Sequence, residues 1–244
     1  MPRPDYSLSL LPDFPVAKKQ AYTLTTHNKA RVDNYYWMRD DERQNEDVLA
    51  HLKAENTYCG AQLAPMKPLQ EAIFEELKGR IVKDDNTVPV KDGTYWYHSE
   101  VRGDDEYSRH YRSTSMSTDN KSLLLDVNEL ATGYEFFELG EVALSPCEQL
   151  MAYSEDTEGR RIYTVRFKNL LTDEMLDDVL ENTEGQIVWA NDNKTVFYVK
   201  KDLQTLLGFQ VFRHELGTKQ SQDVMVYEEH DSSFFMGLGK SRDE

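Results

Sequence analysis

The sequence has little positive charge, almost no cysteine and no long apolar run. Its 244 residues include 28 Lys and Arg against 44 Asp and Glu, which gives a formal net charge of −16 at pH 7. Nucleic acids and anionic membranes are bound through a surplus of basic side chains, so we expect neither as a partner. No stretch of the chain approaches the roughly 18 apolar residues that a membrane-spanning helix needs.

The two cysteines, Cys59 and Cys147, are far apart in the sequence, and neither belongs to a CxxC pair. This spacing provides no disulfide framework, and we expect two small buried side chains in a reducing compartment. Residues 1–28 contain only a short leucine cluster that Pro12 interrupts, which is not the apolar core of a signal peptide. The sequence therefore predicts a cytoplasmic protein.

The common catalytic and ligand-binding motifs are also missing. There is no Gly-x-Ser-x-Gly nucleophile elbow, HExxH motif, P-loop or EF-hand loop. The segment Gly237-Leu238-Gly239 lacks the third glycine of a dinucleotide-binding loop. We therefore predict no catalytic residue, no cofactor and no metal ligand in these 244 residues. Because no histidine pairs with another at metal-ligand spacing, each is interpreted as structural or solvated: His27, His51, His98, His110, His214 and His230.

Residues 46–80 have the period of helices. Asn45 is the expected N-cap of a first helix. A second helix is expected to start at Pro68, whose missing N–H is tolerated in a first turn, and to end at Gly79 as a C′ residue. Residues 64–67 would join the two into a helical hairpin, preceded by an irregular arm that contains residues 31–40. The helical period is carried by Val48, Leu49, Leu52, Cys59 and Leu63 in the first helix and by Leu69, Ile73 and Leu77 in the second.

After Ile81 the period changes to two, which is typical of β-strands. Turn signals such as Asp92-Gly93 and Asp192-Asn193 separate the runs, and no helical period of useful length interrupts them. We expect strands at residues 94–98, 107–112, 122–126, 136–144, 150–154, 161–167, 187–190, 196–200, 209–213, 224–227 and 234–238.

This half of the sequence also repeats itself. Residues 146–153 correspond to residues 191–198, Val165 corresponds to Val211, and an earlier, longer copy begins at Asp92. Four short strands in a unit of roughly 40–50 residues is the size of a propeller blade. The predicted fold class is mainly β with an N-terminal α-helical arm, holding about three blades plus one strand of an incomplete β-propeller. A packed β-sandwich is the alternative.

Propellers need about four to eight blades to close a ring. Three blades and one strand cannot close, so we expect the chain to be part of a longer protein or to assemble with copies of itself.

Two acidic clusters, Asp84-Asp85 and Asp104-Asp105-Glu106, are the candidate binding groups. Either cluster could hold a cation or a basic side chain, but each lies at a polar turn, which favours a solvated loop. The tryptophans are interpreted as core anchors rather than stacking platforms: Trp37, Trp96 and Trp189.

Motifs in several expected elements resemble one known family. Arg31-Val32-Asp33-Asn34-Tyr35-Tyr36-Trp37-Met38-Arg39-Asp40-Asp41 is similar to the N-terminal signature of the prolyl oligopeptidase family of serine peptidases, in its oligopeptidase B form. The same resemblance continues, in order and spacing, through residues 52–58, 106–107, 160–170 and 188–192. It covers nearly the whole chain from His27 onward, while residues 1–26 look like a variable extension.

The resemblance implies a specific organisation. Residues 1–80 would form an arm that packs on an α/β-hydrolase domain absent from this sequence, residues 81–89 a hinge, and residues 90–244 part of a seven-bladed propeller that caps the active site. The family cleaves short peptides, and its oligopeptidase B branch cuts after Arg or Lys. The triad would lie in the missing C-terminal domain, so the resemblance assigns no catalytic residue here.

Two other classes of function remain open at this point. One is a non-catalytic propeller that serves as an interaction scaffold. The other is a propeller enzyme, such as a glycoside hydrolase, that uses its own paired carboxylates. Convergence of Asp104, Asp105 and Glu106 with another carboxylate would favour the latter.

Overall fold

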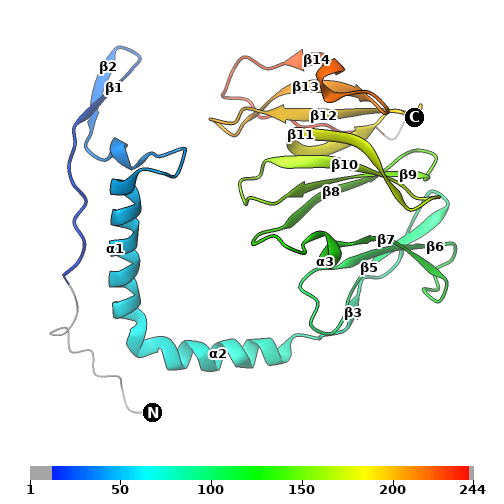
Figure 1. Ribbon diagram of the computed structural model, residues 1–244, viewed down its shortest axis with the longest axis horizontal. Coiled ribbons are helices and arrows are strands. Elements are labelled where there is room, and N and C mark those ends of the chain that lie inside the picture. Colours follow the sequence, from blue (N-terminus) through cyan, green and yellow to red (C-terminus); the bar gives the residue numbers. More distant parts are fainter. Residues whose placement is uncertain (1–12, 242–244) are drawn as a thin grey trace. The chain divides into compact units, whose positions relative to one another are not determined.

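The computed structural model describes residues 13–241, so the leucine cluster before Pro12 lies outside the described residues. The chain divides into two compact units, residues 1–81 and residues 82–244, and each is described by itself. The division falls between Ile81 and Val82, at the start of the segment predicted to be a hinge. Figure 1 shows the order of the elements along the chain.

The first unit begins with a β-hairpin that the sequence analysis missed. Strands β1 (Tyr22–Thr26) and β2 (Lys29–Asp33) pair in an antiparallel register from Tyr22↔Asp33 to Thr26↔Lys29. Their two-residue turn, His27-Asn28, has φ of 51° and 59°, the left-handed values that a tight hairpin requires. The predicted irregular arm is therefore partly strand, and it continues into the short 3₁₀ helix η2 (Tyr36–Met38).

Two helices follow, and one of the predicted caps is confirmed. Asn45 caps α1 (Glu46–Leu63) by accepting hydrogen bonds from the backbone N–H groups of Asp47 and Val48. The second helix, α2, spans Lys67–Arg80 and ends where Ile81 becomes extended. Gly79 thus lies inside the helix, and the prediction that it would be the C′ residue is wrong.

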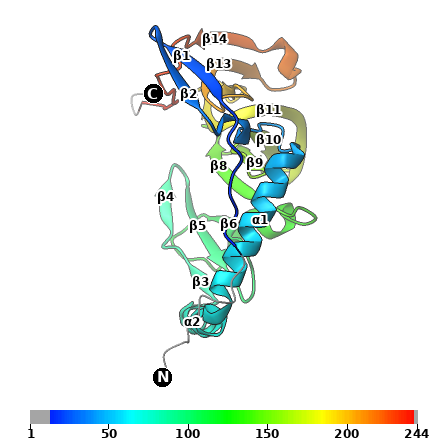
Figure 2. The same ribbon diagram turned by 90° about the vertical axis from the view of Figure 1, so that its left-hand side faces the viewer.

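The predicted helical hairpin is also wrong. The connection is a 3₁₀ turn, η3 (Ala64–Met66), flanked by Leu63 and Lys67, both of which keep right-handed helical backbone angles. Because the backbone never leaves this region, the chain turns a corner without reversing direction. Figures 1 and 2 show α1 and α2 joined end to end at an angle. Neither helix has a fully buried residue, and most of their large apolar side chains are exposed.

The second unit starts with a five-stranded sheet that forms the first blade. Its strands are β3 (Asp85–Asn86), β4 (Val90–Asp92), β5 (Tyr95–Val101), β6 (Arg109–Ser113) and β7 (Lys121–Asp126). Both β3 and β4 pair with β5, so together they take the place of one interrupted inner strand. A short helix, α3 (Val127–Leu130), follows β7.

A seven-stranded sheet contains the second and third blades. Its strands are β8 (Glu138–Leu144), β9 (Leu150–Asp156), β10 (Tyr163–Asn169), β11 (Glu174–Trp189), β12 (Thr195–Lys201), β13 (Gly208–Glu215) and β14 (Val224–Glu228), with the 3₁₀ helix η4 (Gln220–Gln222) before β14.

The strand β11 belongs to both blades. Its first half pairs with β10, and its second half pairs with β12. Asn182 and Gly185, with φ of 60° and 95°, mark the bend between the halves. Residues 187–190, predicted as a separate strand, are thus largely the second half of a longer one, and residues 234–238 contain no strand. The incomplete propeller with a helical arm is confirmed, whereas the sandwich alternative is wrong.

The core lies between the blades. One apolar cluster joins the second and third blades around Phe167 and Trp189, and another joins the first and second blades around Leu124 and Tyr153. The indole N–H of Trp189 donates to the carbonyl of Ala143 at 3.1 Å, so this tryptophan is a core anchor as predicted. Trp37 and Trp96 are only partly buried.

The two cysteines are exposed, contrary to the prediction that they would be buried. Cys59 lies on α1, a helix with no buried residue, and Cys147 lies in the turn between β8 and β9.

Gly140 of β8 provides the first test of blade packing. A Cβ atom at this position would meet the Ser154 hydroxyl and would lie 2.9 Å from Cε1 of Tyr163. Gly140 itself is exposed, but the added methyl group would have to displace the buried Ser154 side chain or the Tyr163 ring, so we expect Gly140→Ala to lower the free energy of unfolding by about 1–2 kcal/mol. Urea denaturation followed by tryptophan fluorescence measures this change.

The control for this variant is Gly60→Ala, since no atom lies within 4 Å of a Cβ built there, inside α1. That change should leave stability equal or slightly higher, because alanine favours a helix interior. Equal stability of Gly140→Ala and the wild type would contradict the packing argument.

Candidate functional site

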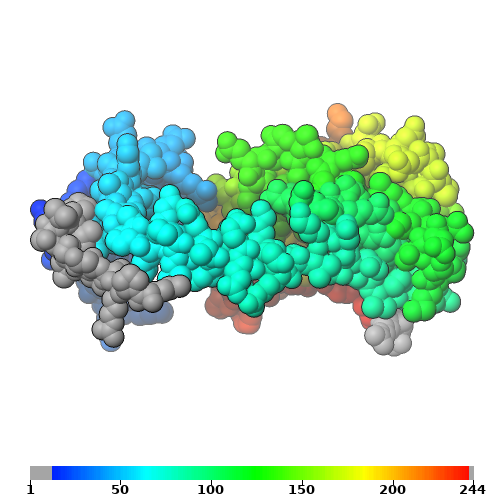
Figure 3. All heavy atoms as spheres, turned by 90° about the horizontal axis from the view of Figure 1, so that it is seen from below, coloured from blue at the N-terminus to red at the C-terminus, as the bar shows by residue number. Residues whose placement is uncertain are grey.

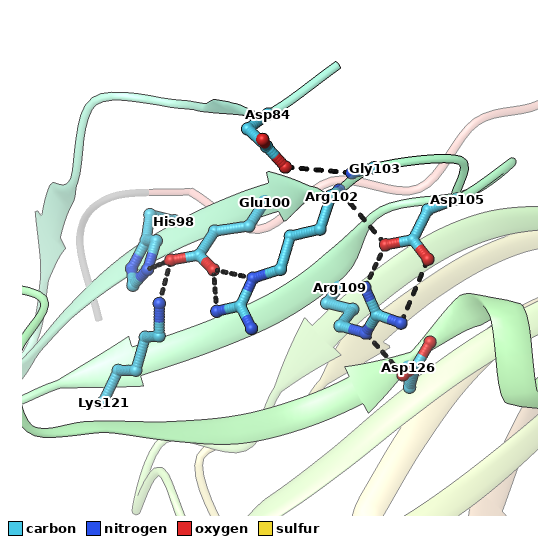
Figure 4. Close-up of polar contacts among 9 residues, drawn as sticks. All are labelled: Asp84, His98, Glu100, Arg102, Gly103, Asp105, Arg109, Lys121 and Asp126. Carbon is cyan, nitrogen blue, oxygen red and sulfur yellow. Dashed lines mark hydrogen bonds and ion pairs between the residues drawn. The ribbon is translucent and has the colours of Figure 1, made fainter.

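The two acidic clusters found in the sequence meet at one end of the first blade. The backbone N–H of Gly103 donates to Asp84 Oδ1 at 2.9 Å, and Lys83 Nζ lies 2.8 Å from Asp104 Oδ1. Asp105 accepts a hydrogen bond from the backbone N–H of Arg102 at 3.1 Å. The segment that precedes β3 is therefore attached to the loop between β5 and β6 (Figure 4).

Asp105 and Asp126, the last residue of β7, bind the same arginine, Arg109. Arg109 Nε lies 2.7 Å from Asp126 Oδ2, while its Nη atoms contact both oxygens of Asp105. The hydrogen bonds that Arg109 donates to Asp105 are the main cause of the raised pKa of its guanidinium. Burial opposes ionisation of Asp126, but hydrogen bonds from Asn128 and Arg109 outweigh it and lower the pKa of that carboxyl.

The acidic clusters thus hold a basic side chain, one of the two roles considered for them. Asp105 does converge with another carboxylate, Asp126, but both carboxylates bind the same guanidinium. Glycoside hydrolysis needs two carboxyl groups that face a sugar between them. Asp85 and Glu106 are exposed and do not join this arrangement, so nothing in its geometry favours the glycoside hydrolase alternative.

A second charged centre lies next to this one, on the same blade, and the sequence analysis missed it. Glu100 accepts hydrogen bonds from Nε and Nη2 of Arg102 at 3.0 and 2.5 Å, and its other oxygen contacts Lys121 Nζ. His98 Nε2 lies 3.2 Å from the same carboxylate. Burial alone would raise the pKa of Glu100, but these three partners lower it to about 2.

These charged side chains cover an aromatic pair. The rings of His98 and Tyr111 stack with centroids 5.4 Å apart, and Lys121 Nζ lies 4.6 Å from the Tyr111 centroid. Glu100 is only 8% exposed, because the long side chains of its partners lie over it. The alternation of His98 and Glu100 along β5, continued by Arg102 just after the strand ends, is the sequence signal that could have found this centre.

The side chains of Glu100 and its partners His98, Arg102 and Lys121, called the charged layer below, face away from the second blade. Tyr97 packs against the apolar cluster shared with the second blade, and its hydroxyl donates to Glu148 Oε1 at 3.1 Å. Successive side chains of a strand point to opposite faces, so His98 and Glu100 lie on the other face of β5. Figure 3, which views the molecule from below, shows the first blade at the surface. The face of the first blade that points away from the second blade therefore carries paired charges over aromatic rings.

The remaining histidines are scattered, as predicted. His214 is fully buried between two carboxylates, and His110 contacts the Ser99 hydroxyl at 3.1 Å, where burial lowers its pKa. Within residues 13–241, no three His, Cys, Asp or Glu side chains are grouped as a metal site would require. No helix in the same range is long and apolar enough to cross a membrane. The prediction that the chain lacks catalytic, cofactor and metal residues stays a prediction.

Comparison with known proteins gives one consistent result. Residues 14–244 match the family model described as prolyl oligopeptidase, N-terminal beta-propeller domain. The chain is 43% identical to dipeptidyl aminopeptidase BI of Pseudoxanthomonas mexicana, over 94% of this chain and 34% of that protein. It is 28% identical to protease 2 of Moraxella lacunata, over 93% of this chain and 34% of that protein.

Solved structures give the same result. Oligopeptidase B from Leishmania major superposes with a TM-score of 0.83 at 32% identity, covering 90% of this chain and 33% of that one. Oligopeptidase B from Trypanosoma brucei, with covalently bound antipain in a closed form, also has a TM-score of 0.83, at 29% identity, covering 94% and 34%. The chain thus spans about a third of the length of these relatives.

Proposed function

Because the chain belongs to the prolyl oligopeptidase family, as part of its N-terminal β-propeller domain, we propose that it serves a serine endopeptidase that cleaves short peptides after Arg or Lys. The family predicted from the sequence motifs is thereby confirmed. The observation that carries the proposal is the superposition of the blades and arm on oligopeptidase B structures, with TM-scores of 0.83.

In this proposal the chain contributes packing and access control, and the chemistry lies elsewhere. Acyl transfer needs a nucleophile, a base and an oxyanion hole in one place, and the sequence offers no nucleophile elbow. We propose that a C-terminal α/β-hydrolase domain supplies these groups. Residues 1–80 would pack on that domain, which is supported by the exposed Leu52, Leu69 and Ile73 on α1 and α2.

Residues 81–89 would then act as the hinge between the arm and the propeller, residues 90–244. The division of the chain at Ile81 supports this role. The propeller would restrict access to short peptides. The cytoplasmic location and the absence of nucleic-acid and membrane partners stay predictions from charge and sequence.

The experiment compares this 244-residue chain with the complete polypeptide that contains it. We expect the 244-residue chain to release no fluorophore from an N-blocked Arg-Arg amide, while the complete polypeptide does so and is stopped by a serine-directed inhibitor. Matched amides ending in Pro or Gln should be poor substrates. A free-amino dipeptide amide tests the activity suggested by the name of one relative, dipeptidyl aminopeptidase BI.

Three outcomes separate the alternatives. Turnover by the purified 244-residue chain, sensitive to the inhibitor, would refute the assignment of the chemistry to another domain. Cleavage after Pro but not after Arg would overturn the proposed specificity. A complete polypeptide with no peptidase activity at all would favour the interaction scaffold.

A further inference from the structure

The loop between β9 and β10, residues 157–162, is held in one shape by a buried carboxylate. Asp156 is 0% exposed and accepts hydrogen bonds from the backbone N–H groups of Glu158, Gly159 and Arg161 at 2.9, 3.0 and 2.6 Å. Lys201 Nζ, from β12 of the next blade, donates to the carbonyl of Arg161 at 2.5 Å. A loop fixed at both its start and its end presents its remaining side chains in defined positions.

One of those side chains is an arginine without a partner. Nε of Arg160 is buried and makes no hydrogen bond, and among residues 13–241 no carboxylate forms an ion pair with its guanidinium. A buried donor left unpaired is costly. Arg160 lines a cavity of about 370 Å³ between the second and third blades. An acceptor supplied by a ligand would satisfy it.

The other charged groups of the cavity are carboxylates, and they are not equivalent. Glu155 is neutralised by Arg166, whose Nε lies 2.5 Å away. Glu158 and Glu181 also line the cavity, are exposed, and have no ion-pair partner in the described part of the chain. The cavity therefore offers one free guanidinium and two free carboxylates. That combination suits a ligand that carries both charges.

The cavity lies at the end of the sheets where the chain enters the propeller. Asp85, at the start of β3, pairs with Val101 at the end of β5. Because β5 and β9 are corresponding strands of successive blades, the loop after β9 lies at the same end of the sheets as the loop after β5. Figure 1 shows the loops after β5, β9 and β12 on the same side of the sheets. Under the proposed function, this end adjoins the hinge and is open to peptide substrates.

We propose that this cavity is a subsite for the peptide substrate. Arg160 binds the C-terminal carboxylate of a short peptide, and Glu158 with Glu181 binds a basic side chain of the same peptide. The inference rests on the proposed function, whose substrates are short basic peptides. It assigns the propeller a direct part in choosing substrates by length, because only a short peptide places its carboxylate in the cavity.

The test uses the complete peptidase and a matched set of peptides. Each peptide has one cleavable Arg bond and a second Arg near its C-terminus, and is made with a free carboxylate, as the C-terminal amide, and with Gln in place of the second Arg. We expect Arg160→Gln to raise KM about tenfold for the free-carboxylate peptide only. The double variant Glu158→Gln/Glu181→Gln should raise KM for the Arg peptides but not for the Gln peptide.

Two further variants guard against indirect effects. Arg160→Lys keeps the charge and should restore part of the affinity for the free carboxylate, which a folding defect would not allow. Arg213→Gln removes an exposed arginine of β13 that has no ion pair in the described residues, and it should change nothing.

Equal effects of Arg160→Gln on the acid and amide peptides, or no effect on either, would overturn the subsite. A loss of kcat on a minimal Arg amide would also overturn it, because Arg160 would then bind another segment of the enzyme. Binding of uncleaved labelled peptide, measured by fluorescence anisotropy, tests the subsite even if the enzyme does not cut after Arg. Binding without such cleavage would reject the proposed function alone.

Discussion

Replacing His214 with alanine is expected to destabilise the propeller unit by about 3–5 kcal/mol, since it breaks a buried charged network from its centre. His214 is 0% exposed, and its two ring nitrogens each lie next to a carboxylate. Nδ1 is 2.7 Å from Asp223 Oδ1, and Nε2 is 3.1 Å from Asp178 Oδ1. The side chains of these two aspartates are only 1% and 8% exposed, so in the folded protein the imidazole takes the place of bulk water around them.

The network also joins parts of two blades. Asp178 lies in the first half of β11, which pairs with the second blade, and His214 lies in β13 of the third. The carboxylates keep one donor each in the variant, because Tyr198 donates to Asp223 at 2.8 Å and the Gly217 N–H to Asp178 at 2.6 Å. These remaining bonds favour the lower half of the expected range.

Urea denaturation of the variant, followed by tryptophan fluorescence, measures the loss of stability. His230→Ala is the matched control, because this histidine is exposed and should matter by less than about 0.5 kcal/mol. A variant at position 214 that unfolds at the wild-type urea concentration would show that the two aspartates find other partners.

Much of this fold could be predicted because the strands alternate and the blades repeat. The correspondence of residues 146–153 with 191–198 reflects two hairpin turns with the same backbone, as Glu148 and Asn193 have φ of 56° and 60°. Both side chains reach back to the preceding blade, where Glu148 accepts from Thr94 N–H and Asn193 from Cys147 N–H. The repeat in the sequence is thus a repeat of contacts between blades.

The elements that were missed lack a local signal of their type. The hairpin β1–β2 turns on His27-Asn28, which contains no glycine and does not look like a tight turn. The continuity of β11 depends on pairing with β10 on one side and β12 on the other, which no local pattern contains. The corner between α1 and α2 follows from backbone angles at Leu63 and Lys67 that both helix continuation and a short connection allow.

Only one half of the candidate site, the acidic clusters, could be predicted from the sequence. The clusters were visible as runs of Asp and Glu, but the basic residues that pair with them are determined by the register of the strands. Arg109 stands opposite Glu100 on β5 and Asp126 on β7, and Lys121 reaches Glu100 across an intervening strand. Cross-strand partners at such separations follow from the three-dimensional pairing alone.

Acidification is expected to weaken the first blade through Glu100. Its pKa is about 2 in the folded chain, against an ordinary value of 4.5. A carboxyl group whose pKa is lowered by folding stabilises the fold above its unfolded pKa, and that contribution is lost as it becomes protonated. Stability should therefore fall as the pH drops from about 4.5 towards 2, with no contribution from this group to any change above pH 6.

The expected size of this contribution is about 1–2 kcal/mol. Lowering the pKa of Glu100 from 4.5 to about 2 corresponds to about 3 kcal/mol of stability before any weakening by solvent is considered. The charged layer is covered only by its own side chains, and solvent reduces the interaction of charges this close to the surface. Arg102, whose side chain is 53% exposed, marks how near the water lies. Salt should reduce the contribution further.

The comparison of wild type with Glu100→Gln isolates this group from the other carboxyl groups. Glutamine keeps the shape and accepts one hydrogen bond, but it cannot pair with Lys121 and Arg102 as a carboxylate does. The two stability curves should be about 1–2 kcal/mol apart at pH 7, and the gap should shrink as the pH falls from about 4.5 towards 2, closing only below the folded pKa of about 2. The control Glu106→Gln, at an exposed position in the next loop, should follow the wild type throughout. Parallel curves for Glu100→Gln and the wild type would mean that Lys121 and Arg102 do not stabilise the ionised carboxyl group.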